Sequence, residues 1–355
     1  MVRVTGNFQS ESPLHPKAFE VLHAAFDNGW ADPGKLSQSA SKANQVKNQA
    51  LESIAESLGV AADSIFAFPS ISLGYFLGIQ GLYENSLTLI HGATDRKDVY
   101  AIASRLSHQV LPCGLDGKLI SPGQKMSSSV LSLQVANAET GVIQEVREVI
   151  RSIGPKKVFL DATTSGIRTK IDEQYSTAIF DGSSWYGPAE IGLLVINEPS
   201  KWSNPLPHLN AAHPNFGVSL PLLLASAVAL ENFSSEVTEA DARARTFNAQ
   251  LRESFALIPD VDIAGSLDSS MAHLLSVSFM NCNGEELLRG IQSDGFSVDS
   301  GSACTADNLQ PSHVLAAMGV LTHGNIRITI HPETTQAEID GLISSVKKNV
   351  ESLRS

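Results

Sequence analysis

FDGSSWYGPAEIGLLVI, at residues 180–196, joins two apolar segments through a turn rich in glycine. Gly182, Gly187 and Pro188 favour a tight turn, because glycine tolerates positive φ angles and proline fixes its own φ. Residues 192–196 are apolar without alternation, which is typical of a strand buried on both faces. The stretch therefore predicts the end of a buried strand, a tight turn and a second buried strand.

The composition excludes several classes of protein. The chain has 355 residues, enough for two domains that share a core, and 43% of them are hydrophobic. A net charge of −12 disfavours non-specific binding to nucleic acids or to anionic membranes. Residues 1–10 lack the apolar core of a signal peptide, and the longest apolar run, 220–230, contains Pro221 and is too short to span a bilayer. We therefore expect a globular protein without a nucleic-acid or membrane partner.

Cysteine usage favours a reducing compartment. The three cysteines, Cys113, Cys282 and Cys304, include no CxxC pair and no His/Cys cluster with zinc spacing. We expect a cytoplasmic protein without a metal site, in which Cys113 and Cys282 are ordinary packing residues.

Strand and helix patterns alternate along the first part of the chain. After irregular residues 2–13, the segment PLHP at 13–16 starts a helix, and apolar residues recur every four positions in a helix at 41–58. Strands predicted at 65–68, 87–91, 130–135 and 158–160 then alternate with helices predicted at 72–82, 97–106 and 142–153. Such alternation indicates a mainly parallel sheet covered on both faces.

The rest of the chain predicts a different arrangement. A buried helix at 220–230 and a longer connecting helix at 239–257 precede a smaller α+β region. That region has strand candidates at 261–264, 275–279 and 326–330, short helices at 285–291 and 312–318, and a final helix opened by a capping box at 335–338. We predict a large α/β domain at 14–235 and a small α+β domain formed by 1–13 and 236–355.

The stretch at 180–196 resembles the cofactor-lysine segment of the cysteine desulfurases, pyridoxal-phosphate enzymes of the class V aminotransferase group. That segment reads S-G-H-K-x-Y-G-P-K-G-I-G. Matched without a gap, the Schiff-base lysine of the family falls on Ser184, the preceding histidine on Ser183 and the phosphate-binding serine on Asp181. The resemblance implies a fold-type I architecture, an α/β fold with a mainly parallel central sheet in the large domain, and a homodimer with its sites near the subunit interface.

Three further segments match the family. Residues 297–319, SVDSGSACTADNLQPSHVLAAMG, are similar to its S-S-G-S-A-C-T and L-E-P-S-x-V-L-R-A-L-G motifs, whose cysteine accepts sulfur as a persulfide and corresponds to Cys304. Residues 325–330 resemble S-I-R-x-S-L, whose arginine, here Arg327, holds a substrate carboxylate. Residues 160–165, LDATTS, resemble V-D-A-T-Q-S, whose aspartate, here Asp161, pairs with the pyridine nitrogen.

Each of these residues also has an ordinary structural interpretation. Cys304 could be a free cysteine left in a loop, and Arg327 could form a surface ion pair. Asp161 lies at the carboxyl end of a predicted strand, and ligands of parallel sheets bind at such ends. It could instead cap a helix or accept local hydrogen bonds.

The departures from the family surround the cofactor. The ring-edge glutamine of the family is Thr164, and its N-N-E-x-G motif keeps Asn137 but replaces the second asparagine with Ala138. Its glycine-rich phosphate cradle is PSIS at 69–72, where Pro69 has no N–H, Ile71 is bulky and Ser72 keeps only a hydroxyl. DRKD at 95–98 is a weak match to E-H-x-A, and the arginine of R-S-G-T-x-N is missing from NAAHPN at 210–215.

Asp181 and Ser184 are the strongest departures. A carboxylate at the phosphate position places like charges together, which costs on the order of kcal/mol. Ser184 cannot form an imine, and no other lysine lies between Lys170 and Lys201.

Three hypotheses for the function follow. The first is a cysteine desulfurase-like protein that has lost covalent pyridoxal phosphate and the family's activity, and that binds a desulfurase or sulfur-transfer partner or accepts sulfur on Cys304. The second is an active pyridoxal-phosphate-dependent desulfurase or lyase with an atypical site. The third is a non-enzymatic protein that binds a carboxylate or an amino acid through Arg327. The candidate site residues are Asp161, Thr164, Ser72, Ser183 and Ser184 for the cofactor, Arg327 and Asn137 for the substrate, and Cys304 for catalysis.

Overall fold

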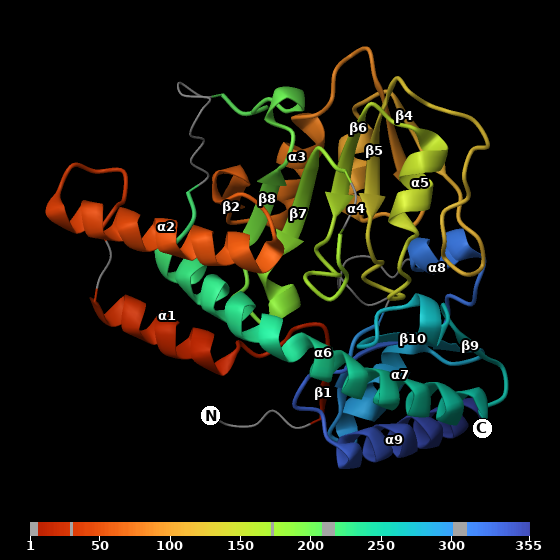
Figure 1. Ribbon diagram of the computed structural model, residues 1–355. Helices are drawn as coiled ribbons and strands as arrows, with labels where there is room; N and C mark the ends of the chain where they lie inside the picture. The colour runs from red at the N-terminus through yellow and green to blue at the C-terminus, as the bar shows by residue number, and fades with distance from the viewer. Residues whose placement is uncertain (1–5, 29–30, 172–173, 208–216, 301–310) are drawn as a thin grey trace.

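A seven-stranded sheet forms the centre of the protein (Figure 1). The computed structural model describes residues 6–28, 31–171, 174–207, 217–300 and 311–355. The strands of this sheet are, in spatial order, β2 (Ile65–Phe68), β8 (Gly192–Ile196), β7 (Thr177–Asp181), β6 (Lys157–Asp161), β5 (Ser129–Gln134), β3 (Thr88–Gly92) and β4 (His108–Leu111). The strands from β7 to β4 pair in parallel, whereas β8 pairs antiparallel with both β7 and β2. The predicted mainly parallel sheet is therefore confirmed.

Helices cover both faces of this sheet, which explains why its strands are apolar without alternation. Every residue of β5, β6 and β8 is buried. One face packs in a single hydrophobic cluster with α1 (Pro16–Asn28), α2 (Gln38–Leu58), α5 (Val146–Ile153) and the first half of α6 (Leu220–Ala256). The other face packs with α3 (Ile71–Gln80) and α4 (Lys97–Ala103).

A second cluster surrounds a three-stranded antiparallel sheet (Figure 1). Its strands lie in the order β12 (Asn325–Thr329), β10 (Leu274–Phe279) and β9 (Val261–Ile263). It is covered by α7 (Gly284–Ser293) and α9 (Gln336–Arg354), and α9 opens with the predicted capping box of Thr335 and Glu338. The same region also contains the short helix α8 (His313–Met318) and the two-residue parallel pair β1 (Asn7–Phe8) and β11 (Ser297–Val298).

The helix α6 corrects the prediction of two helices at 220–230 and 239–257. It runs without a break for 37 residues. The intervening, mostly polar residues 231–238 contain no glycine or proline, and the side chains of Asn232 and Ser234 donate hydrogen bonds to carbonyls one turn earlier. Leu223 and Phe233 of α6 pack in the first cluster, whereas Leu251 packs in the second. A single rod therefore joins both cores, and the domain boundary proposed at 235 falls inside this helix and stays a prediction.

Two other local predictions were wrong. The helical stripe at 142–153 begins only at Val146, because Val142 forms a bridge with Ser270 and Ile143 with Ala136. The edge strand β4 was missed, since most of its residues are exposed and it lacks an apolar run. In the described part of the chain, no helix has both the length and the apolar character needed to cross a membrane.

The continuity of α6 can be tested at Ser235, an exposed residue in its middle. Ser235→Pro should reduce the free energy of unfolding by about 3 kcal/mol or more, because proline removes a helical hydrogen bond and clashes with the preceding turn. Ser235→Ala, the matched control, should stay within about 0.5 kcal/mol of the parent. Urea denaturation measures both, and equal stability of the two variants would indicate a loop at this position.

Candidate functional site

The carboxylate of Asp161 lies at the carboxyl end of β6 and is only 4% exposed. Its Oδ1 accepts hydrogen bonds from the backbone N–H of Thr163 at 2.9 Å and from the Thr163 hydroxyl at 2.6 Å. Its Oδ2 accepts a hydrogen bond from the Tyr75 hydroxyl at 2.5 Å. Both oxygens of this buried carboxylate are therefore satisfied by the chain itself.

Tyr75 reaches Asp161 from α3 and is fully buried. Its ring packs against Phe159 of β6, with the two centroids 5.9 Å apart. Burial raises the pKa of the Tyr75 hydroxyl well above its ordinary value, and the neighbouring Asp161 raises it further. The hydroxyl thus remains protonated and remains the donor.

Arg96 closes the other side of Asp161. It is the N-cap residue of α4, and its Nε lies 3.8 Å from Asp161 Oδ2. One of its terminal nitrogens donates to Thr164 Oγ1 at 3.2 Å, and the side chain is 34% exposed. Burial by itself lowers the pKa of the guanidinium, but the oxygens of Tyr75, Asp161 and Asp181 outweigh this effect and raise the pKa. Arg96 therefore stays charged in front of the carboxylate.

The turn that carries Ser183 and Ser184 is the 3-10 helix η2 (Gly182–Trp185), directly after β7. Asp181 caps this turn by accepting a hydrogen bond from the Ser183 N–H at 2.9 Å. The Ser184 hydroxyl donates back to the Asp181 carbonyl at 2.7 Å. A Cβ atom placed on Gly166 would lie 2.4 Å from Ser184 Oγ, so the turn packs closely on the segment that follows β6. The fold therefore brings the predicted Asp161 and Ser184 segments together.

The resemblance places the family's phosphate cradle at the start of α3, and there the chain has a carboxylate, that of Asp98. The Ser72 hydroxyl donates to Asp98 Oδ1 at 2.6 Å. The N-cap residue, Ser70, makes no side-chain capping bond, and Pro69 precedes it. The negative charges of Asp98 and Asp181 both help to raise the pKa of Arg96.

Asn137 uses its amide within its own loop. Nδ2 donates to the Thr94 carbonyl at 2.9 Å and to Gln134 Oε1 at 3.2 Å. Oδ1 accepts from the N–H groups of Glu139 and Thr140, each at 2.9 Å. This network shapes the loop after β5, and a contact between Asn137 and a substrate stays a prediction.

Arg327 lies on β12 and lines a small cavity of about 10 Å³. Its backbone pairs with that of Asp299, and a terminal nitrogen donates to the Ser300 carbonyl at 3.4 Å. Ala138, the position of the family's second asparagine, lines the same cavity. The structure thus brings two predicted substrate-side positions together. Cys304 lies outside the described residues, whereas Cys113 and Cys282 are buried as predicted.

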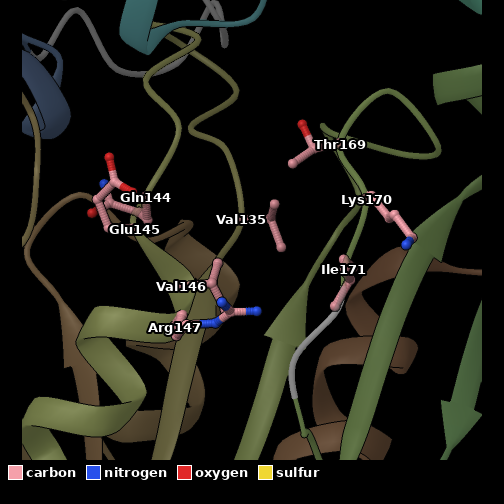
Figure 2. A pocket seen from close by; sticks show the side chains of 8 residues that line it. All are labelled: Val135, Gln144, Glu145, Val146, Arg147, Thr169, Lys170 and Ile171. Carbon is pink, nitrogen blue, oxygen red and sulfur yellow. The ribbon is translucent and has the colours of Figure 1, made fainter.

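Two larger cavities lie elsewhere. Figure 2 shows one of about 330 Å³, where Thr169 and Lys170 lie opposite Gln144 and Arg147, beside the start of α5. The other, of about 1050 Å³, is bordered by α2, β2 and the first turn of α6. Neither is lined by Asp161, Arg96 or Ser184.

Sequence reasoning missed the two side chains that complete the Asp161 site. Tyr75 lies one helical turn after Ser72 in α3, so the apolar pattern of this helix concealed its polar role. Arg96 belongs to the DRKD segment, which matches the family only weakly. The one signal for its role was its positive charge, which could pair with the retained Asp161.

Comparisons with known proteins agree with this architecture. A model of the class V aminotransferase family matches residues 219–342. The cysteine desulfurase IscS of Rickettsia typhi is 26% identical over 98% of this chain and 91% of its own length, and IscS of Ruthia magnifica is 26% identical over 98% and 93%. Among solved structures, a NifS-like protein has a TM-score of 0.85 at 21% identity and covers 99% of both chains. The cysteine desulfurase CsdA of Escherichia coli has a TM-score of 0.82 at 18% identity, over 98% of this chain and 95% of its own.

These findings confirm that the chain is related to the cysteine desulfurases of the class V aminotransferase family. They also confirm the predicted α/β fold of the fold-type I class.

The hydrogen bond from Tyr75 can be tested by its removal. Tyr75→Phe should lower the free energy of unfolding by about 1.5–3 kcal/mol, because a buried carboxylate loses a donor. Tyr100→Phe, the matched control, removes a hydroxyl that donates to the neutral Ala93 carbonyl and should cost about 0.5–1.5 kcal/mol. Urea denaturation compares the two, and a Tyr75→Phe loss no larger than the control would contradict the role given to Tyr75.

Proposed function

We propose that this protein is a cysteine desulfurase-like pseudoenzyme that does not form a Schiff base with pyridoxal phosphate and lacks desulfurase activity. The observation that carries this proposal is the closed environment of Asp161. In the family this carboxylate is expected to pair with the protonated ring nitrogen, whereas here Tyr75 and Thr163 donate to it and Arg96 lies beside it. A pyridine ring would have to displace these groups.

The charge at the expected phosphate position also disfavours the cofactor. Asp98 accepts from Ser72 at the start of α3, and Asp181 caps the turn that contains Ser184. A phosphate dianion between these carboxylates would be repelled, at a cost on the order of kcal/mol. Among the described contacts of this site, the positive charge that could compensate the phosphate is that of Arg96. Its guanidinium already contacts Asp161 and Thr164. The donor set therefore does not fit pyridoxal phosphate.

We infer a binding role in place of catalysis. The named relatives are cysteine desulfurases, so the partner is a desulfurase or a sulfur-transfer protein, and Cys304 is the candidate sulfur acceptor. Phe19 and Phe26 of α1 expose 45% and 64% of their surface, and the exposed Leu36 follows α1 in the chain, which supports a subunit contact of a homodimer. The buried, unpaired Cys113 and Cys282 support a cytoplasmic location.

Arg327 favours a second candidate, binding of a carboxylate or an amino acid without catalysis. Its side chain borders the cavity lined by Ala138 and Glu139, which at about 10 Å³ would have to widen to admit a carboxylate. A ligand there would need neither the Schiff-base lysine nor the phosphate cradle.

The visible spectrum tests the proposal. The protein purified with excess pyridoxal phosphate should show no Schiff-base band that borohydride fixes to residue 184, because Ser184 has no amine. Ser184→Lys alone should not restore cysteine desulfurization, since Asp98, Asp181 and Arg96 remain. Adding Asp181→Ser and Arg96→His to Ser184→Lys should increase cofactor retention over the single variant.

Two results would contradict this account. One is a specific cofactor adduct and cysteine desulfurization by the unaltered protein. The other is full recovery of activity by Ser184→Lys alone. For the sulfur-acceptor role, mass spectrometry after incubation with an active desulfurase and cysteine should find a persulfide on Cys304, and a Cys304→Ser variant serves as the control.

A further inference from the structure

Three basic side chains meet where the seven-stranded sheet region contacts the three-stranded sheet region. Arg168 lies in the turn after β6, His273 directly precedes β10, and His331 follows β12. The Arg168 side chain is 3% exposed, and His273 and His331 are 9% and 7% exposed. We name Arg168, His273 and His331 the basic contact.

Arg168 contacts two residues of α6, Asp241 and Phe233. It forms an ion pair with Asp241, and its other terminal nitrogen donates to the Tyr186 hydroxyl at 3.1 Å. Its guanidinium lies 4.8 Å from the centre of the Phe233 ring, at cation–π distance. The fixed charge of Arg168 is therefore balanced chiefly by one carboxylate, that of Asp241.

The two histidines belong to segments next to strands of the three-stranded sheet. His331 Nε2 donates to the Gln9 carbonyl at 2.9 Å, and the His331 ring lies 6.2 Å from the Tyr186 ring. The His273 carbonyl accepts from the Ile330 N–H at 2.8 Å, which places His273 beside the end of β12. Within the described ranges, Arg168 Nε, His273 Nδ1 and His331 Nδ1 are buried and make no hydrogen bond to the chain.

The environment of the histidines favours their neutral forms. Burial lowers the pKa of His273 well below its ordinary value, and Arg168 and His331 lower it further. Burial also lowers the pKa of His331, although the Gln9 carbonyl and the acidic Glu333 and Asp299 act in the opposite direction. Protonation would thus add positive charge beside Arg168, whose carboxylate partner, Asp241, is already engaged.

We propose that the basic contact is a pH-sensitive switch that holds the two sheet regions together when its imidazoles are neutral and releases them when these imidazoles are protonated. Tyr186 links the switch to the candidate site, because it is the C-cap of the turn containing Ser183 and Ser184 and accepts a hydrogen bond from Arg168. Release would therefore loosen the turn at the position of the missing lysine. The proposal does not depend on whether a cofactor binds.

The direction of the pH effect follows from the lowered pKa values. In the released state the imidazoles titrate near their ordinary value of about 6.5, whereas in the closed state they bind protons only at lower pH. The released state therefore binds more protons below about pH 6.5. The stability of the contact is fully present above that pH and is lost as the pH falls toward the lowered values.

Hydrogen exchange at about pH 7.5 and about pH 5.5, corrected for intrinsic rates, tests the proposal in the full chain. Peptides covering residues 6–10, 270–275 and 328–334 should lose protection at the lower pH, by up to about tenfold for each imidazole that stays neutral in the closed state, because pH 5.5 lies about one unit below the ordinary imidazole pKa of about 6.5. Peptides from β5 and β6, in the middle of the seven-stranded sheet, should keep their protection.

The variant His273→Phe/His331→Gln should abolish the pH response, because the introduced glutamine retains a donor toward the Gln9 carbonyl without a titratable ring. His323→Gln, at an exposed position, is the matched control and should respond like the parent. If the double variant does not fold, His331→Gln alone should reduce the response. Unchanged protection of these peptides in the unaltered protein, or a full pH response in the double variant, would overturn the proposal.

Discussion

The carboxylate of Asp161 is buried at the end of a central strand and accepts hydrogen bonds from Tyr75 and Thr163, with Arg96 beside it. A buried carboxylate without such partners would be costly, since its desolvation is not repaid. These contacts connect three elements, β6 with α3 and with the start of α4. The arrangement of the whole candidate site depends on them, because the turn carrying Ser184 packs on the segment that follows Asp161.

Under the proposed function, the same contacts would keep a desulfurase-like fold stable without a bound cofactor. In the family a bound ring would help to satisfy the aspartate, so loss of the ring would leave a buried charge. Here Tyr75 and Arg96 supply the interactions that the ring would supply, and Ser183 and Ser184 are engaged in the hydrogen bonds of their own turn. This arrangement supports our proposal of a fold that is stable without the cofactor, and its architecture is that of fold-type I proteins.

Features that depend on local pattern could be predicted from the sequence. The apolar run at 192–196 predicted a strand buried on both faces, and the capping box at Thr335 predicted the start of α9. The resemblance placed Asp161 and Ser184 in one site, and the fold brings their segments together.

Features that depend on contacts between distant elements could not be predicted. Asp161 is separated by 86 positions from Tyr75, and no periodicity reports such a hydrogen bond. The helix α6 was divided because its middle is polar, yet a polar surface does not end a helix that has no glycine or proline there. The basic contact likewise joins residues far apart in sequence, and only the packing of the two sheet regions makes these side chains neighbours.

The most direct test of the central claim, that the chain's own donors close the Asp161 pocket, is binding of pyridoxine phosphate. This compound has the ring and the phosphate but no aldehyde, so it cannot react with surface lysines. The free energy of unfolding measured in urea should be independent of its concentration up to about 1 mM, because a ligand stabilises a protein only when it binds the native state. A stabilisation that rises with the logarithm of the ligand concentration, and that disappears in Asp161→Asn, would contradict the account.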